Sequence, residues 1–214
     1  MELQLALDII TIEGAKEILR DLADFIDIVE VGTPFIVQDG MRAVRELRGE
    51  FPALKILADL KIMDAGEYET RMAVAAGANI VTVLGLADDA TIRAAVAEAR
   101  RSGQEIMVDM IGVALVEGRA REIDALGVDY ICVHTGTDVQ ALGRNPLYEL
   151  RRVGKAVSRA RIAVAGGINL GSIAAIVRQA PDIVIVGSGI TAQVDPRSAA
   201  AEIKRVMTEA GARK

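Results

Sequence analysis

Short apolar runs alternate with segments of helical periodicity along the whole sequence, and this alternation constrains the fold more than any other feature. The runs are rich in Val and Ile and show little polar alternation, which is typical of parallel strands covered on both faces. Eight runs of strand length are present, at residues 3–7, 26–31, 56–60, 80–84, 106–111, 128–133, 162–165 and 183–186.

The segments between these runs carry apolar residues at helical spacing. They span residues 14–23, 40–47, 67–76, 89–101, 116–125, 147–157, 170–178 and 198–207. Several end near a glycine suited to a helix C-cap, such as Gly77, Gly103 and Gly127. Eight βα units in 214 residues predict a single (β/α)8 TIM barrel over residues 1–214, because a doubly wound sheet normally needs fewer strands.

Composition excludes several classes of function. The net charge is −5 and the charged residues are mixed in sign, so no basic stripe is available for nucleic acid. Cys132 is the only cysteine, which rules out an intrachain disulfide or a zinc site built on cysteines. The first residues lack the pattern of a secretory signal, and no apolar stretch is long enough to span a bilayer. We therefore expect a cytoplasmic protein without membrane or nucleic-acid partners.

Charged residues follow the first three apolar runs, where a barrel of this class builds its active face. Asp8 ends the first run, Glu30 lies in the second, and the third leads into Asp59, Lys61 and Asp64. Apolar residues separate these last three charges, which argues against a solvated loop. Because side chains alternate along an extended strand, we expect Asp59 and Lys61 to form a buried ion pair, with Asp64 on the loop beyond.

Asp109 and His134 occupy the corresponding positions after the fifth and sixth runs. His134 is the only histidine of the chain. A single histidine after an apolar run can be a structural residue held by hydrogen bonds. Its place beside the other charges at the predicted barrel mouth favours an acid/base role instead.

Glycine-rich turns follow the last two runs. Gly166 and Gly167 follow the seventh, and Gly187 and Ser188 follow the eighth. Glycine lets backbone N–H groups approach a phosphate closely, and barrels commonly bind phosphate in these two loops. We predict a phosphate site here, although the same glycines could simply make tight turns.

Glu30 and Asp59 are candidate metal ligands. Two carboxylates that leave room for water and substrate oxygens suit Mg²⁺, with Mn²⁺ as a substitute. A zinc site is poorly supported because there is no second histidine. The alternative for Glu30 is a structural pairing with a lysine in the barrel mouth.

Together the strand-end segments resemble the 3-hexulose-6-phosphate synthases, within the orotidine 5'-monophosphate decarboxylase suprafamily. The resemblance includes the D-x-K-x-x-D motif at Asp59, Lys61 and Asp64. It implies a homodimer in which Asp59 and Lys61 serve their own subunit while Asp64 reaches the partner's site. Glu30 stands where the decarboxylases of orotidine monophosphate carry a lysine, which implies a Mg²⁺-dependent branch. The segments are residues 5–8, 28–34, 58–66, 81–85, 108–112, 133–136 and 164–167.

The resemblance implies an aldehyde-lyase that adds formaldehyde to D-ribulose 5-phosphate, giving D-arabino-hex-3-ulose 6-phosphate reversibly through a 1,2-enediolate chelated by Mg²⁺. The base that takes the C1 proton would be His134, Asp8 or Asp109. Lys61, held charged by Asp59 and Asp64, would stabilise the enediolate oxygens or donate a proton.

Two alternatives stay open at this point. The first is 3-keto-L-gulonate 6-phosphate decarboxylase, which shares the motif but usually has a glutamate at the place of Asp109 and an arginine after the histidine. Here residues 135–137 are neutral, and this departure favours the synthase. The second is a noncatalytic barrel that binds phosphosugars, which would have no need of Glu30, Asp59 and Lys61 together.

Overall fold

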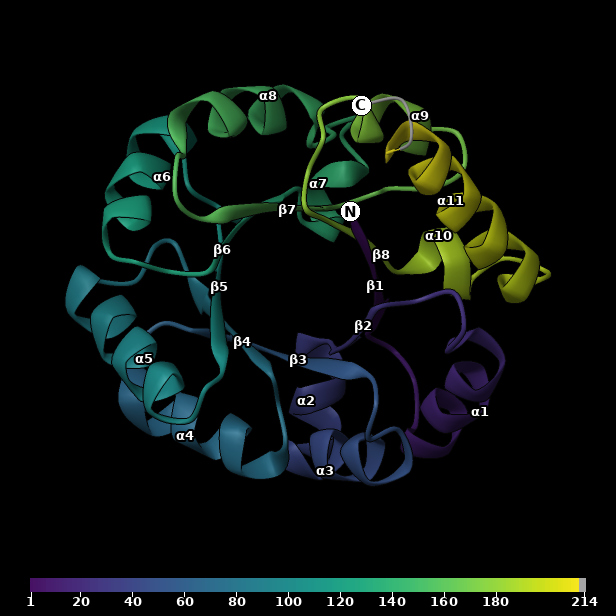
Figure 1. Cartoon of the computed structure of the whole chain (residues 1–214), viewed down its shortest axis with the longest axis horizontal. Helices are drawn as coiled ribbons and strands as arrows, with labels where there is room; N and C mark the ends of the chain where they lie inside the picture. Colours follow the sequence, from purple (N-terminus) through teal and green to yellow (C-terminus); the bar gives the residue numbers. More distant parts are fainter. Residues whose placement is uncertain (212–214) are drawn as a thin grey trace.

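The computed structural model describes residues 1–211. Its eight strands are parallel and close into a barrel. Each strand pairs with its neighbours in sequence, and β1 closes the ring by pairing with β8 (Figure 1). The strands are β1 Glu2–Leu7, β2 Ile28–Val31, β3 Lys55–Ile62, β4 Ile80–Leu84, β5 Glu105–Asp109, β6 Tyr130–His134, β7 Arg161–Ala165 and β8 Ile183–Val186. The predicted (β/α)8 barrel is thus confirmed, and residues 212–214 of the predicted 1–214 domain lie outside the described residues.

Helices surround the strands as an outer ring (Figure 1). They are α1 Ile12–Leu22, α2 Thr33–Asp39, α3 Met41–Glu50, α4 Gly66–Ala76, α5 Asp89–Arg101, α6 Val116–Ala125, α7 Thr137–Gln140, α8 Leu147–Ala156, α9 Ile173–Val177, α10 Ser188–Thr191 and α11 Pro196–Gly211. The helices α2, α7 and α10 were not expected. All three lie in loops that follow a strand, and Pro34 in the first turn of α2 is suited to starting a helix there. No helix in the described chain has the length and apolar character to cross a membrane.

Apolar side chains divide into two layers because neighbouring residues of a strand point to opposite faces. The larger layer fills the space between the strands and the helices and includes Leu5, Val29, Ile56 and Ile131. The smaller one fills the inside of the barrel with ten buried side chains, Ile28, Leu57, Ile80, Met107, Tyr130, Cys132, Ala163, Ala165, Ile183 and Ile185. Polar residues at inward positions nearer the carboxyl ends of the strands therefore rest on an apolar floor.

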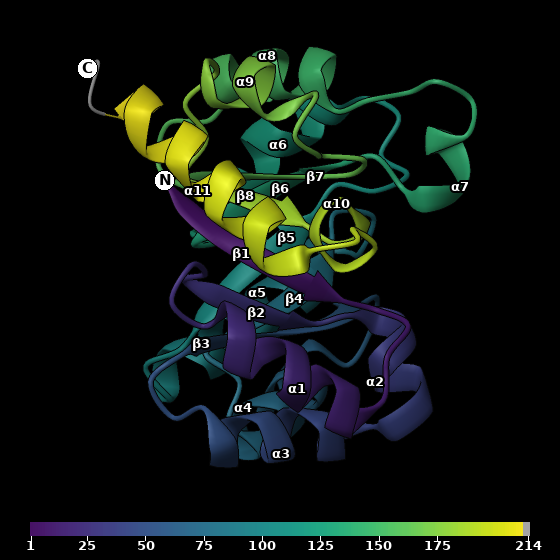
Figure 2. The same cartoon turned by 90° about the vertical axis from the view of Figure 1, so that its right-hand side faces the viewer.

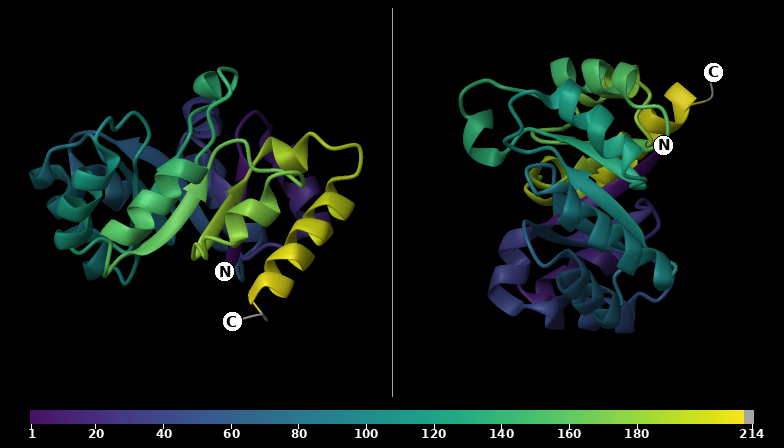
Figure 3. Two further views of the ribbon diagram at one scale, coloured as in Figure 1. Left: turned by 90° about the horizontal axis from the view of Figure 1, so that it is seen from above. Right: turned by 90° about the vertical axis from the view of Figure 1, so that its left-hand side faces the viewer.

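The carboxyl ends of the strands and the chain ends lie at opposite ends of the barrel. Figure 2 shows the strands running away from the N-terminus toward the side where α2, α7 and α10 lie. The last helix, α11, runs back along the barrel, so its end lies near the start of β1 (Figure 3). The mouth formed by the βα loops is the end where barrels of this class carry their sites.

Strand β3 departs from regular geometry at the predicted charge motif. Its pairing with β4 shifts register between Ala58 and Ile62, and Lys61 has a left-handed backbone with φ 49°. A non-glycine residue in that region is strained, and such strain gathers at functional sites. The predicted ion pair of Asp59 and Lys61 forms, but across an irregular stretch of β3 rather than along a regular strand.

Asp124 of α6 holds the turn between α8 and β7. This buried carboxylate accepts hydrogen bonds from the backbone N–H groups of Ser158, Arg159 and Ala160, at 2.7–3.1 Å, and from the Ser158 hydroxyl. Burial by itself raises the pKa of Asp124, but the three N–H groups outweigh it and the net pKa is lowered. The carboxylate thus stabilises the fold above its unfolded-state pKa, and this contribution is lost as the pH falls through the folded-state pKa.

We predict that Asp124→Ala lowers the free energy of unfolding by about 2 kcal/mol at pH 7, because three N–H groups lose their acceptor. The deficit should shrink in acid as the wild-type carboxylate becomes protonated. Urea unfolding of both proteins at pH 7 and in acid measures this. Asp24→Ala is the control, since Asp24 is exposed and its side chain bonds to none of the described residues. Equal losses in the two variants would contradict the assignment.

Candidate active site

Polar side chains from six strands converge inside the mouth of the barrel. They are Gln4 of β1, Glu30 of β2, Asp59 of β3, Thr82 of β4, Asp109 of β5 and His134 of β6, around a cavity of about 20 Å³ floored by apolar residues. The cavity has room for about one water molecule, so any larger ligand must lie above it, against the loops. The structure thus brings together Glu30, Asp59, Asp109 and His134 as the sequence predicts.

Lys61 lies between two buried carboxylates. Its Nζ is 2.6 Å from Asp59 Oδ2 and 2.9 Å from Asp109 Oδ2. Burial would lower the pKa of Lys61, but Asp109 and Asp59 together outweigh it and raise the pKa above its ordinary value. Lys61 is therefore a permanent ammonium ion at neutral pH. The expected pair with Asp59 is present, but within this chain the second carboxylate is Asp109 rather than Asp64.

Two threonines hold Asp59 from either side. Thr82 Oγ1 donates to Asp59 Oδ1 at 2.8 Å and accepts the backbone N–H of Lys61 at 2.9 Å. Thr33 Oγ1 lies 2.8 Å from both the Oδ2 and the backbone carbonyl of Asp59. Sequence analysis missed both residues. Thr82 had a signal, since it is the one polar residue of the apolar run 80–84.

Asp109 orients His134. Nδ1 of the imidazole is 2.9 Å from Asp109 Oδ2, and Asp109 Oδ1 accepts the N–H of Ile111. Burial would raise the pKa of Asp109, but His134 and Lys61 lower it to about 2. An ionised carboxylate can only accept, so Nδ1 must carry a proton, and in a neutral imidazole Nε2 is then the free ring nitrogen. In this tautomer Nε2 of His134 can accept a proton.

Glu30 is buried beside Asp59, and it pairs with no lysine among residues 1–211. Its Oε2 accepts a 2.6 Å hydrogen bond from Gln4 Nε2, a partner that sequence analysis missed. Burial first, and then repulsion from Asp59, raise the pKa of Glu30 well above its ordinary value. A cation placed between the two carboxylates would relieve this repulsion.

Asp8 lies at the rim of the mouth against two glycines. A Cβ on Gly32 would collide with its carboxylate, and a Cβ on Gly187 would lie 3.8 Å from its Oδ2. Partial burial, followed by repulsion from Asp59, raises the pKa of Asp8. The carboxyl group of Asp8, at the rim of the mouth, thus has a raised pKa.

Asp64 lies apart from the other charges. It is exposed on the loop after β3, and its Oδ1 accepts the N–H of Ala65. Exposed Met63, Tyr68 and Met72 lie on the same loop and on α4. Within one chain, therefore, the third residue of the D-x-K-x-x-D motif points into solvent.

The two glycine turns contain backbone N–H groups that lack acceptors among the described residues. Gly166 and Gly167 both have positive φ, 109° and 67°, and a Cβ on Gly166 would collide with Thr135. The N–H groups of Gly166, Gly167, Gly187 and Ser188 have no acceptor among the residues that the structure describes. Free N–H groups in adjacent turns are suited to an anion.

The donor set fits Mg²⁺ or Mn²⁺ better than a metal that needs a complete protein cage. Among residues 1–211 no three His, Cys, Asp or Glu side chains come together as a metal cage. Glu30 and Asp59 instead offer two carboxylates with mutual repulsion, and Mg²⁺ commonly takes its other ligands from water and substrate. These two residues would hold the cation.

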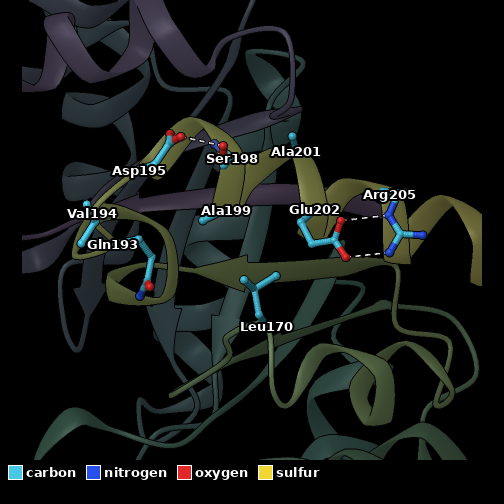
Figure 4. A pocket seen from close by; sticks show the side chains of 9 residues that line it. All are labelled: Leu170, Gln193, Val194, Asp195, Ser198, Ala199, Ala201, Glu202 and Arg205. Carbon is cyan, nitrogen blue, oxygen red and sulfur yellow. Dashed lines mark hydrogen bonds and ion pairs between the residues drawn. The ribbon is translucent and has the colours of Figure 1, made fainter.

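A larger groove lies outside the barrel, between α11 and the loops before it (Figure 4). Leu170, Val194 and Ala199 line it together with the Glu202–Arg205 ion pair and the Asp195–Ser198 cap. Its charged groups are already engaged, Glu202 with Arg205 and Asp195 with Ser198. The chemistry of the molecule is therefore concentrated at the barrel mouth.

The chain is similar to known proteins over nearly its whole length. The chain is 52% identical over 209 residues to the 3-hexulose-6-phosphate synthase of Bacillus subtilis, covering 98% of this chain and all of that protein. The crystal structure of the Salmonella typhimurium 3-hexulose-6-phosphate synthase superposes with a TM-score of 0.96 at 42% identity, over 98% of this chain and 100% of that one. A 3-keto-L-gulonate-6-phosphate decarboxylase from Vibrio cholerae gives 0.85 at 26% identity, over 97% of each chain.

A family model also matches residues 1–203, nearly the whole described barrel. Its description is Orotidine 5'-phosphate decarboxylase / HUMPS family. The match includes every strand and each polar residue of the mouth. The chain belongs to the orotidine 5'-phosphate decarboxylase / HUMPS family, as its strand-end motifs predict.

Proposed function

We propose that this protein is a 3-hexulose-6-phosphate synthase, an aldehyde-lyase that condenses formaldehyde with D-ribulose 5-phosphate. The observation that carries the proposal is the Lys61 ammonium held between Asp59 and Asp109, with His134 oriented by the same Asp109. The similarity to synthases, at 52% and 42% identity, exceeds the 26% identity to the decarboxylase. This difference favours the synthase over 3-keto-L-gulonate 6-phosphate decarboxylase.

The geometry narrows the choice of base that takes the proton from C1 of the substrate. Asp109 is bonded to Lys61 and His134 and has a pKa of about 2, so it is a poor proton acceptor. His134 has a free Nε2, and Asp8 is a carboxyl group with a raised pKa. We assign the base to His134, with Asp8 as the alternative, and we assign Asp109 to positioning.

Loss of the C1 proton leaves an enediolate whose carbon attacks formaldehyde, and the new hydroxymethyl oxygen then needs a proton. Lys61 is an ammonium ion with three N–H donors, so it stabilises the enediolate oxygens and the new oxygen by hydrogen bonds. The proton that the base removes from C1 balances the proton that the new hydroxyl group takes up. A Mg²⁺ ion held by Glu30 and Asp59 would supply further positive charge to the substrate oxygens.

We assign the phosphate of the substrate to the free N–H groups of Gly166, Gly167, Gly187 and Ser188. Binding of this nonreacting end would place the other end of the sugar over Lys61 and His134.

We also propose a cytoplasmic location. Cys132 is buried and free, and the thiol would stay reduced there.

We predict metal-dependent consumption of formaldehyde when the purified protein is mixed with ribulose 5-phosphate and Mg²⁺. Removal of the metal by a chelator should abolish the reaction, and added Mg²⁺ or Mn²⁺ should restore it. Formaldehyde loss is measured directly in the three conditions. Release of CO₂ from 3-keto-L-gulonate 6-phosphate with no loss of formaldehyde would contradict the synthase and favour the decarboxylase. Phosphosugar binding without turnover of either substrate would indicate a noncatalytic barrel.

We predict that Asp59→Ala lowers kcat/KM for formaldehyde addition by at least about 10³-fold, because Lys61 loses a partner and the cation loses a ligand. The fold should persist, since Asp59 lies at the mouth rather than in the apolar layers. Steady-state kinetics and the circular dichroism spectrum test both statements. Asp24→Ala serves again as the surface control, and near-normal turnover of Asp59→Ala would refute the assignment.

We further propose a homodimer in which Asp64 completes the partner's site. Asp64 is exposed and out of contact with Lys61 of its own chain, and exposed Met63, Tyr68 and Met72 are available for an interface around it. Such an interface would bury both the apolar side chains and the motif residue that one chain leaves in solvent.

Co-expression of two inactive variants tests the shared site. If Asp59 serves its own chain and Asp64 the partner's, then Asp59→Ala and Asp64→Ala are each inactive, but a mixed dimer contains one intact site. Random mixing should therefore restore about a quarter of wild-type activity. A monomer by light scattering, or no recovery in a mixture shown to contain mixed dimers, would contradict the shared site.

A further inference from the structure

Gln4 is a buried polar residue for which the proposed chemistry gives no role. It lies on the inner face of β1, fully excluded from solvent, with Ile28 of β2 as its register partner. Its Nε2 donates to Glu30 Oε2 at 2.6 Å. Its Oε1 is buried and has no hydrogen-bond partner among the described residues.

Burying this amide costs free energy, so we expect it to have a function at the barrel mouth. A buried amide oxygen without a partner is unfavourable, and an apolar side chain of similar size would fill the same space without that cost. Glu30, in turn, has a single donor, Gln4, among the described side chains. The amide therefore acts on one group alone, the carboxylate that we assign to the cation.

We propose that Gln4 is a positioning residue that fixes the Glu30 carboxylate for cation binding, an inference that rests on the proposed function. The bond to Oε2 fixes the rotation of the carboxylate and leaves Oε1 of Glu30 for the cation. Gln4 and Glu30 line the same cavity as Asp59. The free Oε1 of Gln4 offers a hydrogen-bond acceptor to the hydration shell that Mg²⁺ usually keeps.

Binding of Mn²⁺ to the metal-free protein, followed by electron paramagnetic resonance, tests this role without any assay of turnover. Gln4→Met keeps the volume of the side chain but removes both polar atoms. We expect the Kd for Mn²⁺ to rise at least about tenfold, as for other groups that orient a metal ligand. The melting temperature of the metal-free variant should be no lower than that of the wild type, because the unpartnered oxygen is gone.

Thr70→Val is the matched control. Thr70 is also fully buried with an unpartnered Oγ1, but it lies on α4, outside the barrel interior. This variant should leave the Kd for Mn²⁺ unchanged. A second variant, Glu30→Gln, should abolish tight Mn²⁺ binding, and adding Gln4→Met to it should weaken binding no further if Gln4 acts only through Glu30.

The outcomes separate this inference from the proposed function. Wild-type affinity in Gln4→Met refutes the role of Gln4 while leaving Glu30 as a ligand. Weaker affinity together with a lower melting temperature assigns Gln4 to the fold and refutes positioning. A wild-type protein that binds no Mn²⁺ overturns both the cation site and the role of Gln4. Weaker binding in Gln4→Met supports the inference even if formaldehyde is not consumed.

Discussion

The ion pairs of Lys61 with Asp59 and Asp109 organise the rest of the barrel mouth. Two carboxylates from β3 and β5 could not lie this close in a largely buried space without the ammonium between them. His134 and Lys61 together keep Asp109 ionised, and the ionised Asp109 accepts a proton-bearing Nδ1 from His134. Removing the charge of Lys61 would therefore affect His134 on β6, because both side chains bond to Asp109.

The backbone of β3 is adapted to this arrangement. The bulge and the left-handed φ at Lys61 place its Nζ within reach of both carboxylates, and Thr82 binds the Lys61 N–H as well as Asp59. A residue in this conformation is strained, so the surrounding bonds must hold it. The apolar layer beneath supplies the rigid floor, and the threonines supply the lateral restraints.

Sequence patterns predicted the barrel, the strand ends and most of the polar residues that meet at the mouth. They succeed because carboxyl ends of parallel strands must gather at one end, whatever the register between them. They did not predict that Asp109, rather than Asp64, is the second partner of Lys61, since this depends on the bulge and on the register of β3, β4 and β5. Thr33 and Gln4 were missed for a related reason, because each bonds to a residue of a neighbouring strand, Asp59 of β3 and Glu30 of β2. Single polar residues at inward positions of apolar runs, such as Gln4 and Thr82, are a signal that could have been used.

The two described chain ends lie at the opposite end of the barrel from the mouth, because β1 starts there and α11 returns there (Figure 3). Attachments at either end of the molecule, whether an affinity tag, a fluorescent reporter or a second enzyme, would begin on the far side from the substrate entrance. The topology thus makes this barrel a convenient unit for building bifunctional catalysts.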